Sequence, residues 1–127
     1  MKWENAEDIK QRLEQILCVL DLPHINLNRV FCYRTYGSKS RAFARTWAFP
    51  KVFQHALDVE AAYVIEVVSQ YFDKLDEEKK TRVLIHELLH IPKNFSGALL
   101  PHKTGQQNIS QAVSMLYKEY KRQTNEK

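Results

Sequence analysis

Apolar residues recur at helical spacing in the first part of the chain. Between residues 5 and 20 they form one stripe, made of Ile9, Leu13, Ile16, Leu17 and Leu20. This period predicts an amphipathic helix that packs its stripe against a core. Asn5 is a candidate N-cap. Pro23 ends the helix, because proline lacks the N–H that a further turn needs.

The pattern changes from helical to extended after Pro23. Residues 25–36 alternate at first and are then rich in strand formers, which predicts a strand. Residues 40–49 are ambiguous between strand and helix, although their alternation fits an antiparallel strand. Pro50 suits the first position of a short helix. Tyr63–Val68 is the strongest strand signal in the chain.

A second helix is predicted from Asp76 to about Ile91. Asp76 is its candidate N-cap, and the next two residues, Glu77 and Glu78, suit the first turn. The acidic cluster lacks the D-x-D-x-D-G spacing of a Ca²⁺ loop. Residues 107–121 predict a last helix packed beneath this one, followed by a polar tail, residues 122–127, that frays.

The second helix carries the signature H-E-x-x-H. His86 and His90 stand four residues apart, which places two imidazoles on one helical face. Zn²⁺ accepts imidazole nitrogens at about 2.0–2.1 Å and prefers four ligands. Glu87 lies between them and can act as general base on a water whose pKa the metal lowers to about 7. The alternative is a core helix with two hydrogen-bonded histidines, but burying these groups without partners costs several kcal/mol.

A catalytic zinc needs a third protein ligand. His102 is the preferred candidate, because Pro92, the turn formers Asn94, Ser96 and Gly97, and then Pro101 allow the chain to double back. Glu119 in the last helix is the alternative, although it stands in a strongly basic segment. The metzincin spacing is excluded by Lys93 and Ser96. His24 and His55 are expected to be a loop residue and a partly exposed helical residue.

These motifs resemble a family of short metallopeptidases found in archaea and phages. The resemblance rests on residues 86–92 (HELLHIP), Phe95-Ser96-Gly97, Pro101-His102, residues 44–50 and residues 63–67, and covers roughly residues 25–105. The spacing of the distant histidine is also similar to SprT-like metalloproteases, which act on proteins bound to DNA. The resemblance implies a zincin-like fold, one zinc ion at His86, His90 and His102, and a catalytic Glu87. In that fold the strand before the metal-binding helix commonly forms the upper edge of the cleft, so the resemblance also implies that Tyr63–Val68 is a sheet edge to which an extended peptide adds.

The expected architecture is therefore a single α+β domain over residues 1–127. It would have a zincin-like fold, in which a small, mostly antiparallel sheet packs against the H-E-x-x-H helix and flanking helices. With 127 residues, 44% of them hydrophobic and 27% charged, the composition is that of an ordinary globular domain. We expect zinc-dependent hydrolysis of a protein or peptide, with Tyr36 or Tyr117 as a candidate donor to the oxyanion.

The cysteines and the hydropathy of the chain indicate the cellular compartment. Cys18 and Cys32 are too few for a disulfide framework and sit among apolar residues, so we expect two buried free thiols in a reducing cytoplasm. No apolar run approaches 18 residues, and the first residues lack the apolar core of a signal peptide. We therefore expect a cytoplasmic protein with no membrane partner.

The net charge of +4 leaves a second class of function open. Lys39, Arg41, Arg45 and Lys51, with nearby aromatics, are a candidate nucleic-acid surface. The alternative is a solvated basic surface, since 15 acidic residues are interleaved along the chain. The second hypothesis for function is thus a non-catalytic module stabilised by zinc, associated with nucleic acid through its basic face.

Overall fold

A four-stranded sheet forms the base of the molecule in the computed structural model, which describes residues 1–104 and 107–125. Its strands are β1 (Lys2–Asn5), β2 (Val30–Tyr36), β3 (Ala44–Ala48) and β4 (Tyr63–Val68), in the spatial order β1-β2-β4-β3. The helices are α1 (Glu7–Val19), α2 (Lys51–Leu57), α3 (Ser69–Phe72), α4 (Glu77–Leu88) and α5 (Ile109–Asn125). A 3₁₀ turn (Leu27–Arg29) precedes β2, and the short strands β5 (Lys103–Thr104) and β6 (Gln107–Asn108) pair before α5.

The sheet is mixed rather than mostly antiparallel. β1 and β3 run antiparallel to their neighbours, but β2 and β4 pair in parallel. The predicted α+β class is confirmed, but the sheet is mixed and not mostly antiparallel as expected. The prediction that Tyr63–Val68 forms an edge was wrong, because β4 lies between β2 and β3. Strong β-propensity and near-complete burial are typical of a central strand, and the shorter β3 forms the edge instead.

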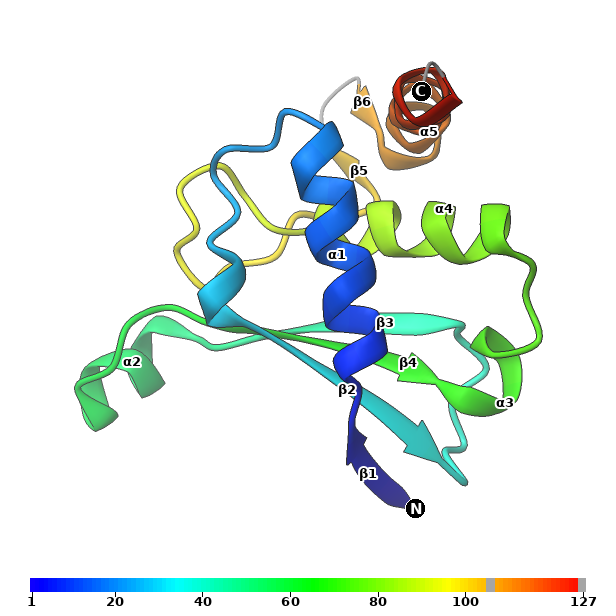
Figure 1. Ribbon diagram of the computed structural model, residues 1–127. Helices are drawn as coiled ribbons and strands as arrows, with labels where there is room; N and C mark the ends of the chain where they lie inside the picture. The colour runs from blue at the N-terminus through cyan, green and yellow to red at the C-terminus, as the bar shows by residue number, and fades with distance from the viewer. Residues whose placement is uncertain (105–106, 126–127) are drawn as a thin grey trace.

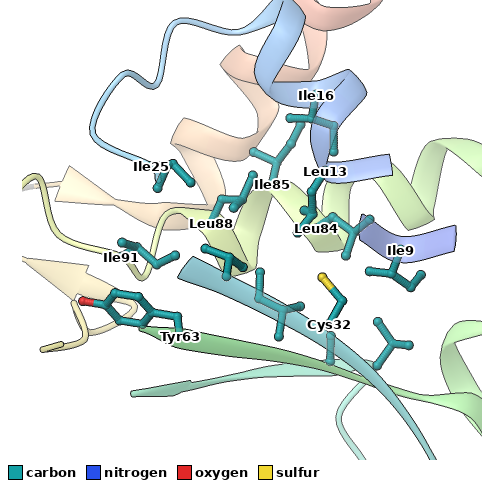
Figure 2. Close-up of a cluster of buried hydrophobic side chains, with 14 of the residues drawn as sticks. Ile9, Leu13, Ile16, Ile25, Cys32, Tyr63, Leu84, Ile85, Leu88 and Ile91 are labelled. Atoms are coloured by element: carbon teal, nitrogen blue, oxygen red, sulfur yellow. The ribbon is translucent and has the colours of Figure 1, made fainter. Parts of the chain in front are cut away.

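The three long helices, α1, α4 and α5, lie on the same side of the sheet (Figure 1). The core fills the space between α1, α4 and this face, as Figure 2 shows. The stripe expected on α1 contributes Ile9, Leu13 and Ile16, all essentially buried. They meet the buried face of α4, made of Leu84, Ile85 and Leu88. Burying each such side chain stabilises the fold by about 1.5–3 kcal/mol.

The opposite face of the sheet holds β3 against β4 through a buried carboxylate. Glu66 is fully buried, and its oxygens accept hydrogen bonds from Thr35 (2.7 Å), Arg45 (3.2 and 3.3 Å) and Trp47 (2.8 Å). A buried charge is tolerated when paired and hydrogen-bonded in this way. Arg45, one of the four residues of the candidate basic surface, is therefore committed to Glu66.

Several local predictions need correction. Helix α1 begins at Glu7 after Ala6, and Asn5 ends β1 instead of capping the helix. Residues 25–29 are not part of the strand predicted for 25–36, which starts at Val30. The predicted tail is helical as far as Asn125, and residues 126–127 lie outside the described residues.

The cysteine prediction holds in part. Both Cys18 and Cys32 are free, but Cys18 is exposed on α1 and only Cys32 is buried. None of the helices in the described part of the chain is both long and apolar enough to cross a lipid bilayer.

The loop that follows α4 is tied to the sheet. The Tyr63 hydroxyl donates to the carbonyl of Ala98 and accepts from the N–H of Gly97, both at 2.8 Å. The Gln54 amide on α2 donates to the carbonyls of Phe49 (2.7 Å) and Ser96 (2.9 Å). Three hydrogen bonds with the side chains of Tyr63 and Gln54 thus hold residues 96–98 in place, and the fourth ties Gln54 to Phe49.

Gly97 is the position in this loop that tolerates a side chain least. Its φ is +97°, and a Cβ there would meet the Phe49 carbonyl oxygen at 2.4 Å and the Gln54 amide nitrogen at 2.2 Å. We expect Gly97→Ala to lower the free energy of unfolding by about 3 kcal/mol or more, from backbone strain plus overpacking. Urea unfolding followed by circular dichroism measures this.

Gly37→Ala is the matched control. Gly37 also has a positive φ, +74°, but its added Cβ would meet nothing closer than the Met1 Cα at 3.6 Å. That substitution should cost only the strain, about 1–2 kcal/mol. Equal losses in the two variants would contradict the tight packing assigned to Gly97.

Candidate metal centre

The structure confirms how the H-E-x-x-H helix begins and corrects where it ends. The side chain of Asp76 accepts a hydrogen bond from the N–H of Lys79 at 2.9 Å, which caps α4 as predicted. The helix ends at Leu88, three residues before the predicted Ile91. His90 follows in a tighter turn, because its N–H bonds to the carbonyl of Glu87 at 3.1 Å. The rings of His86 and His90 still lie together, with centroids 5.0 Å apart.

Two hydrogen bonds between His90 and Leu100 close the loop after α4. The Leu100 N–H donates to the His90 carbonyl at 2.7 Å. In return, the ring Nδ1 of His90 lies 2.5 Å from the Leu100 carbonyl. Since a carbonyl only accepts, Nδ1 carries the proton and Nε2 keeps its lone pair for a metal.

This closure brings His102 to the other two histidines. Its ring centroid is 5.1 Å from that of His86 and 4.7 Å from that of His90. One candidate ligand atom from each of the three residues lies within 4.8 Å of the others. Zn²⁺ binds imidazole nitrogen at about 2.0–2.1 Å, so the three rings fit a single ion after small rotations.

His86 is held in the form that binds metal. Burial of the ring, together with the nearby rings of His90 and His102, lowers the pKa of His86 to about 4. The imidazole of His86 is therefore neutral at neutral pH, and a neutral imidazole is the metal-binding form.

Glu87 points away from solvent. It is 6% exposed, and the hydroxyl of Thr46 on β3 donates to its carboxylate oxygen Oε1 at 2.9 Å, while lying 3.2 Å from its main-chain oxygen. Burial raises the pKa of Glu87, and the Thr46 hydrogen bond and the charges of His90 and His102 partly oppose this rise. A carboxylate with a raised pKa is a stronger base, as proton transfer near neutral pH requires.

A cavity of about 490 Å³ adjoins the cluster. His86, Glu87 and His102 line it, together with Phe43, just before β3, and Ser114 on α5. Among the described residues, the group that can hold a metal contains these three histidines and no fourth acidic or cysteine ligand. The arrangement therefore combines three imidazoles, a buried carboxylate and adjoining space for a ligand.

The other sequence candidates lie outside this cluster. Glu119, the alternative third ligand, pairs instead with Arg122 on the next turn of α5. His55 is exposed on α2, and His24 lines a different cavity beside α5. The candidate oxyanion donors do not line the cavity at the cluster: Tyr36 is bonded to Glu4, and Tyr117 stacks on Arg82.

Sequence reasoning missed Thr46. The sequence left residues 40–49 ambiguous between strand and helix, and the partner of Thr46 depends on how β3 lies against α4. A hydroxyl in a strand carries no local signal for such a contact, so only the tertiary arrangement identifies it.

Comparison with known proteins gives one finding. The model of a family described as "putative phage metallopeptidase" matches residues 1–115. No curated protein and no solved structure matches the chain. The family match extends the resemblance noted above, over roughly residues 25–105, to most of the chain.

The closed loop makes a direct prediction about His102. Protein purified without added metal should hold about one zinc ion per chain, and His102→Ala should lose most of it, because two ligands on one short segment bind weakly. Elemental analysis of both proteins, side by side, measures this.

His55→Ala is the matched control, because it removes an exposed histidine from α2. It should retain zinc as the wild type does. Full zinc in His102→Ala would contradict its assignment as a ligand and would return attention to Glu119.

Proposed function

The chain belongs to the phage metallopeptidase family, and from that premise we propose that it is a zinc-dependent peptidase. The observation that carries the proposal is the convergence of His86, His90 and His102 beside the buried carboxylate of Glu87. The three histidines would hold one zinc ion, with Nε2 of His90 as one ligand atom. When bound, the ion would polarise the scissile carbonyl and make an attacking water more acidic.

Glu87 would be the general base. Its raised pKa favours taking a proton from water and later giving that proton to the leaving amine. The Thr46 hydroxyl donates a hydrogen bond to Oε1 of Glu87. This bond would orient the carboxylate and leave Oε2 free to accept from the water.

The substrate would be a peptide in extended form. β3 pairs with β4 along one side only, and residues 42–44, just before and at its start, line the cavity at the cluster. A peptide could add to the open side of β3 by main-chain hydrogen bonds. We therefore propose β3 as the substrate-binding edge, where the sequence had suggested Tyr63–Val68. The free cysteines are consistent with a reducing cytoplasm, which is where we propose the protein acts.

The alternative of a zinc-stabilised, non-catalytic module is less well supported. A structural zinc site is closed by a fourth protein ligand. The described residues supply three, and a cavity lies beside them.

Replacing Glu87 distinguishes the peptidase hypothesis from the hypothesis of a non-catalytic, zinc-stabilised module. Glu87→Gln keeps the shape and removes the base, so we expect zinc content and stability to persist while peptide hydrolysis falls by about 10²–10⁴-fold. Cleavage of a quenched fluorescent peptide library, with zinc measured in the same samples, tests this. Unchanged hydrolysis in Glu87→Gln would sink the peptidase proposal.

Thr46 offers a finer test of how Glu87 is held. Thr46→Val keeps the volume and removes the hydroxyl, which should lower kcat about tenfold, the value of one charge-assisted hydrogen bond of about 1.5 kcal/mol, with little change in KM. Thr46→Ser retains the hydroxyl and should restore most of the rate. Equal kcat values in the valine and serine variants would show that the hydroxyl does not position Glu87.

A further inference from the structure

The cavity beside the histidines has one permanent positive charge among the described residues that line it. That charge is Arg82, which lies on α4 one turn before His86. Positions four apart share a helical face, so Arg82 and His86 both face the cavity. The hydroxyls of Ser110 and Ser114, on α5, line the same space.

Arg82 is held in place but incompletely bonded. Its guanidinium stacks on the ring of Tyr117, 5.0 Å from the centroid, and its Nε lies 3.3 Å from a carboxylate oxygen of Glu78. The buried Nε makes no well-aligned hydrogen bond, and Nη1 reaches the Ser114 hydroxyl only at 3.5 Å. The Glu78 side chain is 50% exposed, and such a surface pair contributes little. The guanidinium thus retains donors for an anionic group.

The spacing relates this charge to the bond that would be cleaved. One helical turn of four residues advances about 6 Å along α4. An extended peptide advances about 3.3 Å per residue. A group bound by Arg82 would therefore belong to a residue one or two positions from the scissile bond.

We propose that Arg82 and Ser114 form a carboxylate-binding subsite, and that the substrates carry a carboxylate within about two residues of the scissile bond. A planar guanidinium binds a carboxylate through two parallel hydrogen bonds. The carboxylate is either an acidic side chain or the free C-terminus of the peptide. This inference rests on the proposed peptidase function and defines its substrate class.

The test uses probes that bind without being cleaved. Peptidyl hydroxamates chelate the metal, and they are made in two series, with the hydroxamate at the N-terminal or the C-terminal end of a dipeptide. In each series the residue next to the hydroxamate is glutamate or glutamine. In the first series the C-terminus is either free or amidated, which distinguishes the two sources of carboxylate. Dissociation constants are measured by calorimetry on zinc-loaded protein.

Wild-type protein should bind one carboxylate probe about 10–100-fold more tightly than its neutral isostere, the range expected for charged hydrogen bonds. Arg82→Gln should lose that preference and keep its affinity for the neutral probe. Arg82→Lys, which keeps the charge without the planar fork, should retain only part of it. Lys79→Gln is the matched control, because it removes a positive charge from the exposed side of the same helix and should keep the full preference.

Two outcomes would overturn the subsite. One is equal affinity of wild-type protein for charged and neutral probes in both series. The other is a preference that survives in Arg82→Gln, with folding of that variant verified by circular dichroism. Charge-selective binding together with no cleavage of any peptide would overturn the peptidase proposal and leave the subsite standing. Failure of every probe to bind zinc-loaded protein would overturn both.

Discussion

The candidate centre depends on the pair of hydrogen bonds between His90 and Leu100. One bond joins their main chains and the other joins the His90 ring to the Leu100 carbonyl. Together they fold the chain after α4 back on itself, so that His102 meets two histidines from which it is separated by a loop. The same contact determines which His90 nitrogen is free. A single local closure therefore positions His102, the third candidate ligand, and orients the ring of His90, the second.

The loop and the sheet are part of this arrangement. The hydroxyl of Tyr63 reaches the loop from the central strand, and Thr46 reaches Glu87 from the edge strand. The core between α1, α4 and the sheet fixes the distance over which these two side chains act (Figure 2). The site is thus supported by side chains from the sheet rather than by α4 alone.

The sequence predicted the features that depend on spacing within a short segment. The pairing of His86 with His90, the cap at Asp76 and the strand at residues 63–68 follow from periodicity and from local hydrogen bonding, which are properties of short segments. The proximity of His102 was inferred from turn formers and from resemblance, and the structure brings it to the other two histidines. The order of strands depends on pairing between distant segments, so the central position of β4 and the strand β1 were missed. The contacts of Thr46 with Glu87, and of Arg82 with Ser114 and Tyr117, join different elements and left no mark in the local pattern.

The loop also bears on how fast a bound ion would exchange. Two of the proposed ligands stand on α4 and the turn that ends it, while the third follows a segment held by Tyr63, Gln54 and Leu100. An ion would leave in steps, and the first step requires this segment to open, because His102 cannot withdraw while it is closed. The free energy of opening residues 91–101 would then set the residence time of the metal, independently of its equilibrium affinity. Substitutions at Tyr63 or Gln54, which contact no ion, would act as controls on the rate of metal release.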